Sequence, residues 1–116
     1  MIRLLAVVAA AMPLTMGSAL ALGYMSGDDL LANCKADVDS NGQGRCLGYI
    51  AGLADFIITR QELRKQADIC FPDGVSAEQM RDIVVRFLEA RPEIRQYKAD
   101  GAVVEALVKV WSCPKR

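Results

Sequence analysis

The clearest periodic pattern of apolar residues lies between residues 76 and 90. Its members recur at spacings of three and four, which places them along one side of a helix; they are Met80, Ile83, Val84, Phe87 and Leu88. Ser76 precedes them as an N-cap, and Gln79 stands where a capping box needs a glutamate or glutamine. Pro92 favours a stop near Ala90. The pattern therefore predicts an amphipathic helix that begins after Ser76 and ends near Ala90.

A longer apolar run predicts the central helix of the fold. Nearly every residue in the range 46–54 is apolar, and a helix that is apolar on most sides is buried on most sides. Polar residues dominate its continuation, so we expect one helix over about residues 45–66 whose second half projects into solvent. Residues 37–44 collect aspartate, serine, asparagine and glycine, which is typical of a loop.

Two shorter helices are predicted on either side. The first follows the N-cap Ser26, spans about residues 28–35, and has acidic residues in its first turn, where they complement the helix dipole. The last spans about residues 99–112 and stops before Pro114. The side chains expected to point inward are Leu30, Leu31 and Cys34 in the first helix, and Val103, Leu107, Val110 and Trp111 in the last.

A turn is expected between the second and third predicted helices. In the sequence Pro-Asp-Gly at residues 72–74, proline fixes its own φ and glycine permits a positive φ, so Pro72 and Gly74 have a structural role. No stretch of useful length alternates apolar and polar residues with the period of a strand. The expected fold class is therefore all-α, a compact bundle of about four to five helices.

The N-terminus has the layout of a secretory signal. A positive charge precedes an apolar stretch at residues 4–14, and Ala-Leu-Ala at residues 19–21 fits a signal peptidase site. A membrane anchor is the alternative, but the apolar stretch is short for a bilayer span and is interrupted by a proline. We expect residues 1–21 to be a cleaved signal peptide and residues 22–116 to form a single helical domain.

Four cysteines in an exported domain indicate two disulfides. Helix rise would separate the ends of the long helix by about 30 Å, so Cys46 at its start cannot reach Cys70 beyond its end. Short loops make successive helices antiparallel neighbours. The first helix therefore ends beside the start of the long helix, and the last helix returns to its far end. This arrangement predicts the disulfides Cys34–Cys46 and Cys70–Cys113.

Composition disfavours several classes of function. The chain has 14 basic and 14 acidic side chains and no histidine. A balanced charge gives no electrostatic basis for binding nucleic acid or an anionic membrane. Without histidine, the usual base beside a nucleophilic serine or cysteine is missing, and so is the commonest zinc ligand. No two cysteines have the CxxC spacing of a metal site. We therefore predict no enzymatic activity, no metal and no cofactor.

Three residues in the long helix stand out against its apolar run. Gly48 and Gly52 lie four apart on one face, and each costs about 1 kcal/mol of helix propensity relative to alanine. A close helix approach would explain both glycines, and we expect it within the fold rather than across a dimer. Asp55 is expected to pair with nearby backbone or a basic side chain; the alternative is a polar contact at a dimer or partner surface.

The connection before the last helix carries charged residues together with an aliphatic and an aromatic residue. Tyrosine and arginine are frequent anchors of protein interfaces. An ordinary solvated loop with its apolar residues tucked underneath has the same composition, so composition alone leaves both interpretations open. The candidate partner-binding residues are Arg91, Glu93, Ile94, Arg95 and Tyr97.

Several short motifs, taken in order, resemble those of one family. They are Gly-Asp-Asp-Leu-Leu at residues 27–31, Cys-Leu-Gly-Tyr-Ile-Ala-Gly at 46–52, Ile-Cys-Phe-Pro-Asp-Gly-Val at 69–75 and Trp-Ser-Cys at 111–113. The pattern spans nearly the whole predicted domain. It resembles the amidase immunity proteins of type VI secretion, called the Tai family.

The resemblance implies a periplasmic, all-helical, disulfide-bonded protein that often forms a homodimer. Such a protein binds a peptidoglycan amidase toxin and occludes its catalytic cleft, so it is an inhibitor and not an enzyme. The alternative is a small disulfide-stapled periplasmic chaperone or stress protein on the same helical scaffold.

Occlusion of a cleft requires a protruding element with few internal roles. The two candidates are the turn at residues 67–75 and the connection at residues 91–98. Cys70 would tether the first, so we expect the second to enter the toxin. A specific inhibitor interface buries on the order of 1,600 Å² in total, more than one loop provides. Helix surface beside the connection must therefore contribute.

Overall fold

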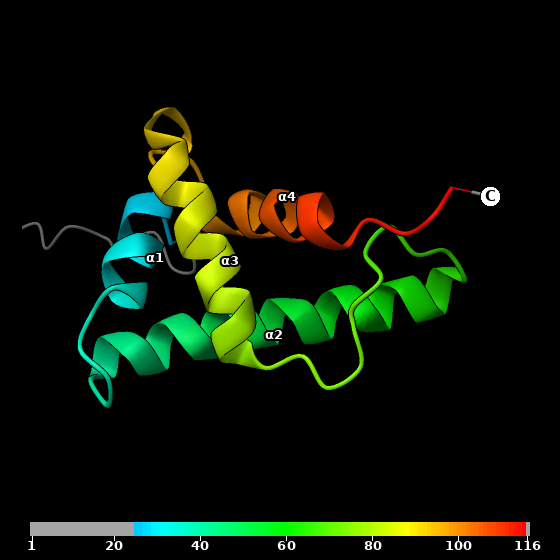
Figure 1. Ribbon diagram of the computed structural model, residues 1–116, viewed down its shortest axis with the longest axis horizontal. Helices are drawn as coiled ribbons and strands as arrows, with labels where there is room; N and C mark the ends of the chain where they lie inside the picture. Colours follow the sequence, from blue (N-terminus) through cyan, green and yellow to red (C-terminus); the bar gives the residue numbers. More distant parts are fainter. Residues whose placement is uncertain (1–24, 116) are drawn as a thin grey trace, which may run out of the picture.

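The computed structural model describes residues 25–115, which contain four α-helices (Figure 1). The connection between the second and third helices, residues 65–76, is the longest. Among residues 25–115 no strand forms; extended backbone pairs only at two isolated β-bridges, Ser26 with Lys98 and Ile69 with Ser112. The all-α prediction is confirmed. The expected signal peptide, residues 1–21, lies outside the described residues. The elements are α1 (Gly27–Cys34), α2 (Asn41–Arg64), α3 (Ala77–Ala90), the 3₁₀ turn η1 (Pro92–Ile94) and α4 (Ala99–Trp111).

Serine residues begin α1 and α3 as the sequence predicts. Ser26 and Ser76 each complete a capping box, with Asp29 and Gln79 at the third helical position. In both boxes the serine hydroxyl oxygen accepts the backbone N–H of that residue at 3.1 Å. These bonds satisfy N–H groups that have no partner inside the helix, so they fix where each helix starts.

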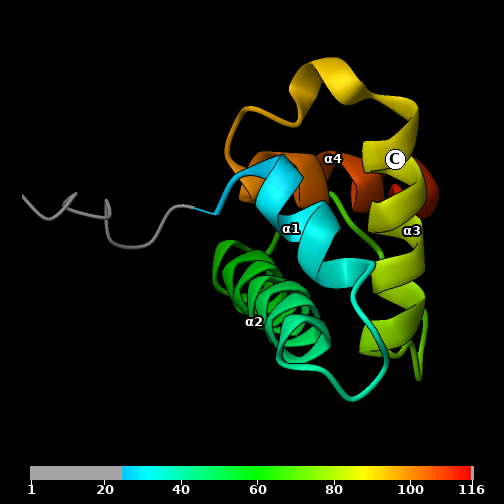
Figure 2. The same ribbon diagram turned by 90° about the vertical axis from the view of Figure 1, so that its left-hand side faces the viewer.

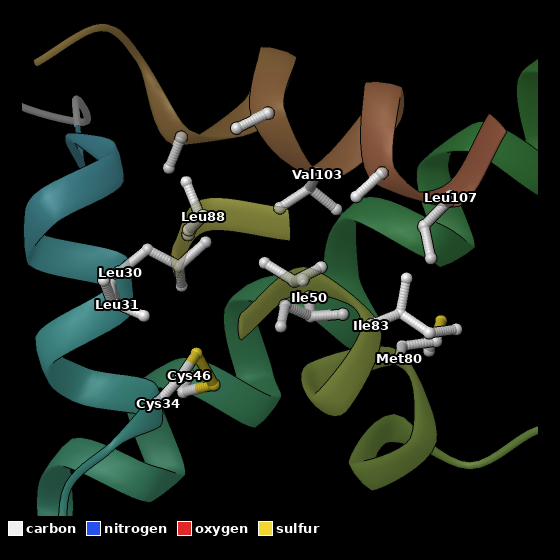
Figure 3. Close-up of a cluster of buried hydrophobic side chains, with 14 of the residues drawn as sticks. Leu30, Leu31, Cys34, Cys46, Ile50, Met80, Ile83, Leu88, Val103 and Leu107 are labelled. Carbon is white, nitrogen blue, oxygen red and sulfur yellow. A yellow bond between two sulfur atoms is a disulfide. The ribbon is translucent and has the colours of Figure 1, made fainter. Parts of the chain in front are cut away.

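The hydrophobic core receives side chains from all four helices. Leu30, Ile50 and Leu107 are fully buried, and Figure 3 shows them converging with side chains of α3. Fully burying a leucine or isoleucine side chain is worth roughly 2–3 kcal/mol relative to leaving it exposed. These contacts hold α1 and α3 against α2, and α4 against α1 and α3.

α2 is longer than the helices that cover it. Its buried residues end at Ala54, and the rest of the helix continues to Arg64 beyond α1 and α3 (Figure 1). The predicted solvent-exposed second half is confirmed. The first half is buried along one side only, because α1 and α3 cover that side. The expectation that it is buried on most sides is wrong. Among residues 25–115, no helix is both long and apolar enough to cross a bilayer.

α2 begins inside the stretch predicted as a loop, residues 37–44. The Ser40 hydroxyl oxygen caps it by accepting the backbone N–H of Gln43 at 3.2 Å. The Gln43 side-chain amide is buried and donates to the carbonyl oxygens of Cys34 and Ala36 at 2.6 and 2.7 Å. These bonds compensate for the poor helix propensity of the two glycines in this turn. The second half of the predicted loop is therefore helical.

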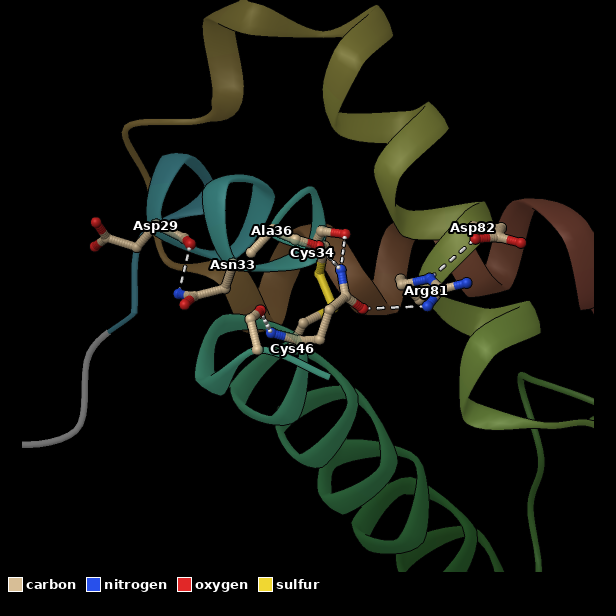
Figure 4. The surroundings of a disulfide bond; sticks show 9 residues. Asp29, Asn33, Cys34, Ala36, Cys46, Arg81 and Asp82 are labelled. Atoms are coloured by element: carbon tan, nitrogen blue, oxygen red, sulfur yellow. Dashed lines mark hydrogen bonds and ion pairs between the residues drawn. A yellow bond between two sulfur atoms is a disulfide. The ribbon is translucent and has the colours of Figure 1, made fainter. Parts of the chain in front are cut away.

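Both predicted disulfides are present, one at each end of α2. Cys34–Cys46 joins the end of α1 to the first turns of α2 (Figure 4). Cys70–Cys113 joins the segment after α2 to the residues after α4. In each bond the two Cα atoms are 5.0 Å apart. The pairing inferred from the length of the long helix is confirmed. The expectation that successive helices are antiparallel is wrong, because α1 and α3 cross α2 steeply (Figure 1).

The 66–70 segment connects the far end of α2 to the end of α4. The Gln61 side-chain amide donates to the Ile69 carbonyl oxygen at 3.0 Å, and its oxygen accepts two backbone N–H groups of the segment at 3.0 and 2.9 Å. The Cys70 N–H donates to the Trp111 carbonyl oxygen at 2.8 Å. Ile69 is buried. The segment is thus held on one side by α2 and on the other by α4.

The predicted turn at residues 72–74 is confirmed. The Val75 N–H donates to the Pro72 carbonyl oxygen at 3.4 Å, and Gly74 has a φ of 72°. The last turn of α4 differs from expectation. Val110 was predicted to point inward, but it is exposed, because it opens onto a hollow that α3 and the 72–75 turn border without filling. Trp111 is half-buried.

Candidate partner-binding surfaces

The 91–98 loop is held against the start of α1 by its backbone. The Gly27 N–H donates to the Tyr97 carbonyl oxygen at 2.9 Å, and the Asp28 N–H donates to that of Arg95 at 2.8 Å. A Cβ atom at Gly27 would lie 2.9 Å from the Arg95 Cα, so glycine is needed for this close approach. Figure 2 shows the loop as an arch beyond α1, α3 and α4. It protrudes as expected, but in a fixed shape.

Two of the five predicted partner-binding residues have internal roles. The Arg95 guanidinium donates to the carbonyl oxygens of Leu88 and Glu89 at 2.7 and 3.0 Å. These carbonyls belong to the last turn of α3, where the regular helical pattern of hydrogen bonds ends; that of Leu88 also accepts the Arg91 N–H at 3.3 Å. Ile94 is partly buried and packs against the core. Both side chains therefore attach the loop to the body of the domain.

Arg91 connects the loop to α4. Its guanidinium donates to a Glu105 carboxylate oxygen at 2.7 Å and to one of Glu93 at 3.3 Å, and it lies 5.3 Å from the centre of the Phe87 ring. The pKa of Glu93 is lowered by its own backbone N–H and then by Arg91. Arg91 thus holds two carboxylates in place at the surface.

Glu93 and Tyr97 have exposed side chains. Tyr97 is 64% exposed, and its loop contacts are made by backbone atoms rather than by the ring. A partner could cover both side chains without disturbing the contacts that shape the loop. Of the five candidates, these two are therefore best placed for direct recognition.

An apolar groove between α2 and α4 was not identified from the sequence. We define the α2–α4 groove by Leu53, Phe56, Ile57, Val104 and Val108. One end of the groove is a hollow of about 220 Å³, which the 66–70 segment borders. We call this the far end of the groove. Glu105, the partner of Arg91, lies on the rim. The groove therefore adjoins the 91–98 loop. Its α2 residues belong to, or follow, the apolar run that the sequence assigned to the core.

Phe56 is the most prominent apolar residue at this groove. Its side chain is 56% exposed, and the Arg60 guanidinium lies 5.7 Å from the centre of its ring. At the end nearer the start of α2, Tyr49 lies beside Asp100. The pKa of the Tyr49 phenol is raised, first by burial and second by the negative charge of Asp100. The groove is thus apolar along its floor with polar groups at its borders.

Gly48 and Gly52 lie on the outer side of α2, and both are exposed. A Cβ atom built at either glycine would have no heavy atom within 4 Å. The predicted close approach within the fold is therefore wrong, because no described element covers this side of α2. The alternative contact across a dimer stays open for both glycines.

Asp55 is also exposed on α2. Among residues 25–115, its carboxylate has no hydrogen bond or salt bridge to another side chain. The predicted pairing with nearby backbone or a basic side chain is wrong, because Asp55 lies on an exposed side of α2 and Arg60 of the same helix lies over the Phe56 ring instead. The alternative, a polar contact with a partner, fits its exposure.

The described residues also bear on metal binding and cysteine chemistry. Within residues 25–115, no three histidine, cysteine, aspartate or glutamate side chains gather into a group that could hold a metal ion. The described cysteines are all in disulfides. The candidate sites are therefore the two surfaces described above, the 91–98 loop and the α2–α4 groove.

A family model described as Rap1a immunity proteins matches residues 26–113. The match begins at the N-cap of α1 and ends at Cys113, so it includes all four helices and both disulfides. No curated protein and no solved structure matches the chain.

Proposed function

Because the chain belongs to the Rap1a immunity protein family, we propose that it protects against a secreted peptidoglycan amidase delivered by type VI secretion. The observation that carries this proposal is the family match over the whole helical domain, residues 26–113. Family membership supports a protein toxin as the partner. The amidase identity rests on the motifs that resemble the Tai family.

The proposed mode of action is occlusion of the toxin's catalytic cleft, without catalysis by this chain and without a cofactor. The 91–98 loop supports this mode because it protrudes and because backbone and side-chain bonds fix its shape. A pre-organised loop loses little conformational freedom on binding. Glu93 and Tyr97 would contact the toxin directly. Arg91, Ile94 and Arg95 would hold the loop in its binding shape.

A periplasmic location is part of the same proposal. Residues 1–21 would act as a cleaved signal peptide and residues 22–116 would form the mature domain. Two disulfides support this location, because such bonds persist in oxidising compartments. A peptidoglycan amidase acts in that same compartment, so toxin and inhibitor would meet there.

We also propose that the protein forms a homodimer through the α2–α4 groove and the adjoining outer side of α2. A two-fold interface presents the same surface on both partners, so a projection and a hollow must lie on one face. Exposed Phe56 supplies a projection, and Gly48 and Gly52 leave open space beside it. Asp55 and Arg60 lie on the same helix and could pair across the two-fold axis.

The test of toxin recognition is a binding measurement with two matched variants. The probe is any peptidoglycan amidase encoded beside this gene, purified and titrated by calorimetry. Truncation of a hot-spot tyrosine at an interface costs about 2 kcal/mol or more, or roughly 30-fold in Kd, and Tyr97 is proposed to be such a residue. We therefore expect Tyr97→Ala to weaken binding about 30-fold. Val38→Ala, which removes an exposed side chain between α1 and α2, should leave Kd unchanged.

If both variants lost affinity equally, or if neither lost affinity, the 91–98 loop would be ruled out as the contact. Failure of the unmodified protein to bind the amidase would rule out the proposed function. In that case, suppression of client aggregation across a pH series would favour the chaperone alternative.

The homodimer has an independent test. Phe56→Asp should shift the protein from dimer to monomer in sedimentation equilibrium. At concentrations below the dimer dissociation constant, where both proteins are monomers, it should leave the unfolding temperature unchanged, because the side chain is outside the core. Val38→Asp introduces the same charge at a remote exposed site and should leave the dimer intact. A monomeric unmodified protein would contradict the proposed homodimer.

A further inference from the structure

The two disulfides differ in their access to solvent. Cys34 and Cys46 are 5% and 0% exposed and lie within the hydrophobic core. Figure 4 shows their bond between the end of α1 and the first turns of α2, with Arg81 of α3 nearby. Cys70 is exposed and Cys113 is half-buried. A reductant must approach a sulfur atom directly to attack it, so only the second bond offers that approach in the folded protein.

The exposed disulfide holds the 66–70 segment against α4. Besides this bond, the junction has two backbone hydrogen bonds: Cys70 N–H to the Trp111 carbonyl oxygen at 2.8 Å, and Cys113 N–H to that of Asp68 at 3.1 Å. The Phe71 and Trp111 rings also meet there, with their centres 5.9 Å apart, and Ile69 of the segment is buried in the core. On the other side, Gln61 holds the same segment to α2.

The 66–70 segment also borders the α2–α4 groove. Gln66, Asp68 and Ile69 line its far end, opposite Val104 and Val108 of α4. α2 and α4 each pack against α1 and α3 at the other end of the molecule. At the far end the segment and its disulfide bridge the two helices. The shape of the groove there depends on this bond.

We propose that Cys70–Cys113 is a redox-sensitive latch that a dithiol reductant opens while Cys34–Cys46 stays closed. A thiolate of the reductant attacks one sulfur atom, which forms a mixed disulfide and releases the other cysteine as a thiolate. The second thiol of the reductant then displaces the first cysteine. The protein gains two electrons and two protons as two thiols, and the reductant becomes a disulfide.

Opening the latch loosens one end of the α2–α4 groove, where Ile69 joins the core, and leaves the part of the core around Cys34–Cys46 intact. The core side chains of α1 and the buried disulfide make no use of the Cys70–Cys113 bond. Reduction therefore weakens whatever binds in the groove. If the groove binds a second copy of this chain, reduction weakens the dimer; that consequence rests on the proposed homodimer. The order in which the two disulfides are reduced does not rest on it.

The order of reduction is tested by titrating the unmodified, natively folded protein with dithiothreitol, alkylating the free thiols and mapping the labelled peptides. We expect at least tenfold more label on Cys70 and Cys113 than on Cys34 and Cys46 at intermediate concentrations. Equal labelling of both pairs, or earlier labelling of Cys34 and Cys46, would overturn the latch.

The structural effect is tested by hydrogen exchange on the selectively reduced protein. The amides of Cys70 and Cys113 should exchange at least tenfold faster than in the oxidised protein, while the amides of Leu30, Leu31 and Ile50 keep their protection. Unchanged exchange at Cys70 and Cys113 would show that the backbone bonds alone hold the segment and would overturn the latch.

The effect on the groove is tested by sedimentation equilibrium of both redox forms and of the variant Cys70→Ser/Cys113→Ser. We expect the dimer dissociation constant to rise at least tenfold on selective reduction and in this variant. An unchanged constant would overturn the control of the groove by the latch. An oxidised protein that is already monomeric would refute the homodimer, while the labelling result still decides the latch.

Discussion

Each end of α2 is joined to the rest of the chain by a glutamine side chain and a disulfide, but the two ends differ in their exposure to solvent. At the start of the helix, Gln43 bonds to backbone carbonyls after α1, and Cys34–Cys46 lies beside it. At the other end, Gln61 bonds to the returning backbone, and a disulfide follows. The first pair is buried in the core, and the second pair lies in or near solvent.

This difference separates stability from recognition along a single helix. Buried polar groups and buried disulfides contribute through packing and desolvation as well as through their own bonds. The same groups at a solvated end contribute mainly by restricting the chain. The start of α2 therefore determines the fold, whereas its far half presents the α2–α4 groove to partners. The predictions below test that division.

The largest expected contrast uses one substitution at both ends. Leu30 is 0% exposed in the core, and Leu63 is 80% exposed near the end of α2. Truncation of a buried leucine removes its packing and leaves a cavity, at a cost of about 3–5 kcal/mol. We expect Leu30→Ala to lower the free energy of unfolding by that amount, and Leu63→Ala to change it by less than about 0.5 kcal/mol. Urea denaturation measures both, and equal losses would contradict the division.

The two glutamines give a second matched pair. Gln43→Ala leaves the carbonyl groups of Cys34 and Ala36 without their buried donor, at a cost of about 2–3 kcal/mol. The Gln43 side-chain oxygen also accepts from Arg81 at 3.1 Å, so each glutamine makes three side-chain bonds. Those of Gln61 lie at a more solvated site, where water replaces them, so we expect Gln61→Ala to cost about 1 kcal/mol. Thermal unfolding of both variants checks the order. A larger loss for Gln61→Ala would show that the far end carries more of the fold than we infer.

Two glycines of α2 give a third matched pair, one in close contact with the end of α1 and one facing solvent. A Cβ atom at Gly42 would lie 2.7 Å from the Ala36 Cβ, whereas one at Gly48 meets no heavy atom within 4 Å. We expect Gly42→Ala to destabilise the protein, and Gly48→Ala to stabilise it by up to about 1 kcal/mol through helix propensity. Chemical denaturation at low protein concentration measures both. Stabilisation by Gly42→Ala would contradict the close contact between α2 and the end of α1.

The smallest expected effect concerns pH at the 91–98 loop. The pKa of Glu93 lies below its ordinary value of 4.5, because its own backbone N–H and Arg91 favour the carboxylate. The stabilisation from this carboxylate is therefore present above pH 4.5 and is lost as the pH falls through the lowered pKa. Nuclear magnetic resonance titration should give a midpoint below 4.5 that rises in Arg91→Ala. A midpoint at or above 4.5 in the unmodified protein would contradict this arrangement.

Much of the fold follows from local signals in the sequence. The apolar spacing of α3, the serine caps at Ser26 and Ser76, and the turn at residues 72–74 each act over a few residues, so each was predicted correctly. The disulfide pairing followed from the length of α2, which keeps its two ends apart. These features depend little on how distant parts of the chain pack.

The errors arose where distant packing decides the outcome. An apolar run gives no sign of which side a neighbouring helix covers, so Gly48 and Gly52 were assigned to the interior. The start of α2 depends on a buried bond from Gln43 to the end of α1, which no local pattern reveals. The internal role of Arg95 likewise depends on the carbonyls of α3 lying within its reach.

The central claim, inhibition of a secreted amidase by this chain, is tested most directly by peptidoglycan hydrolysis. Any peptidoglycan amidase encoded beside this gene would be purified and assayed on isolated peptidoglycan while this protein is added in increasing amounts. We predict that hydrolysis falls linearly and stops near equimolar protein, as expected when a tight inhibitor covers the cleft. Undiminished hydrolysis in the presence of excess folded, oxidised protein would contradict the account.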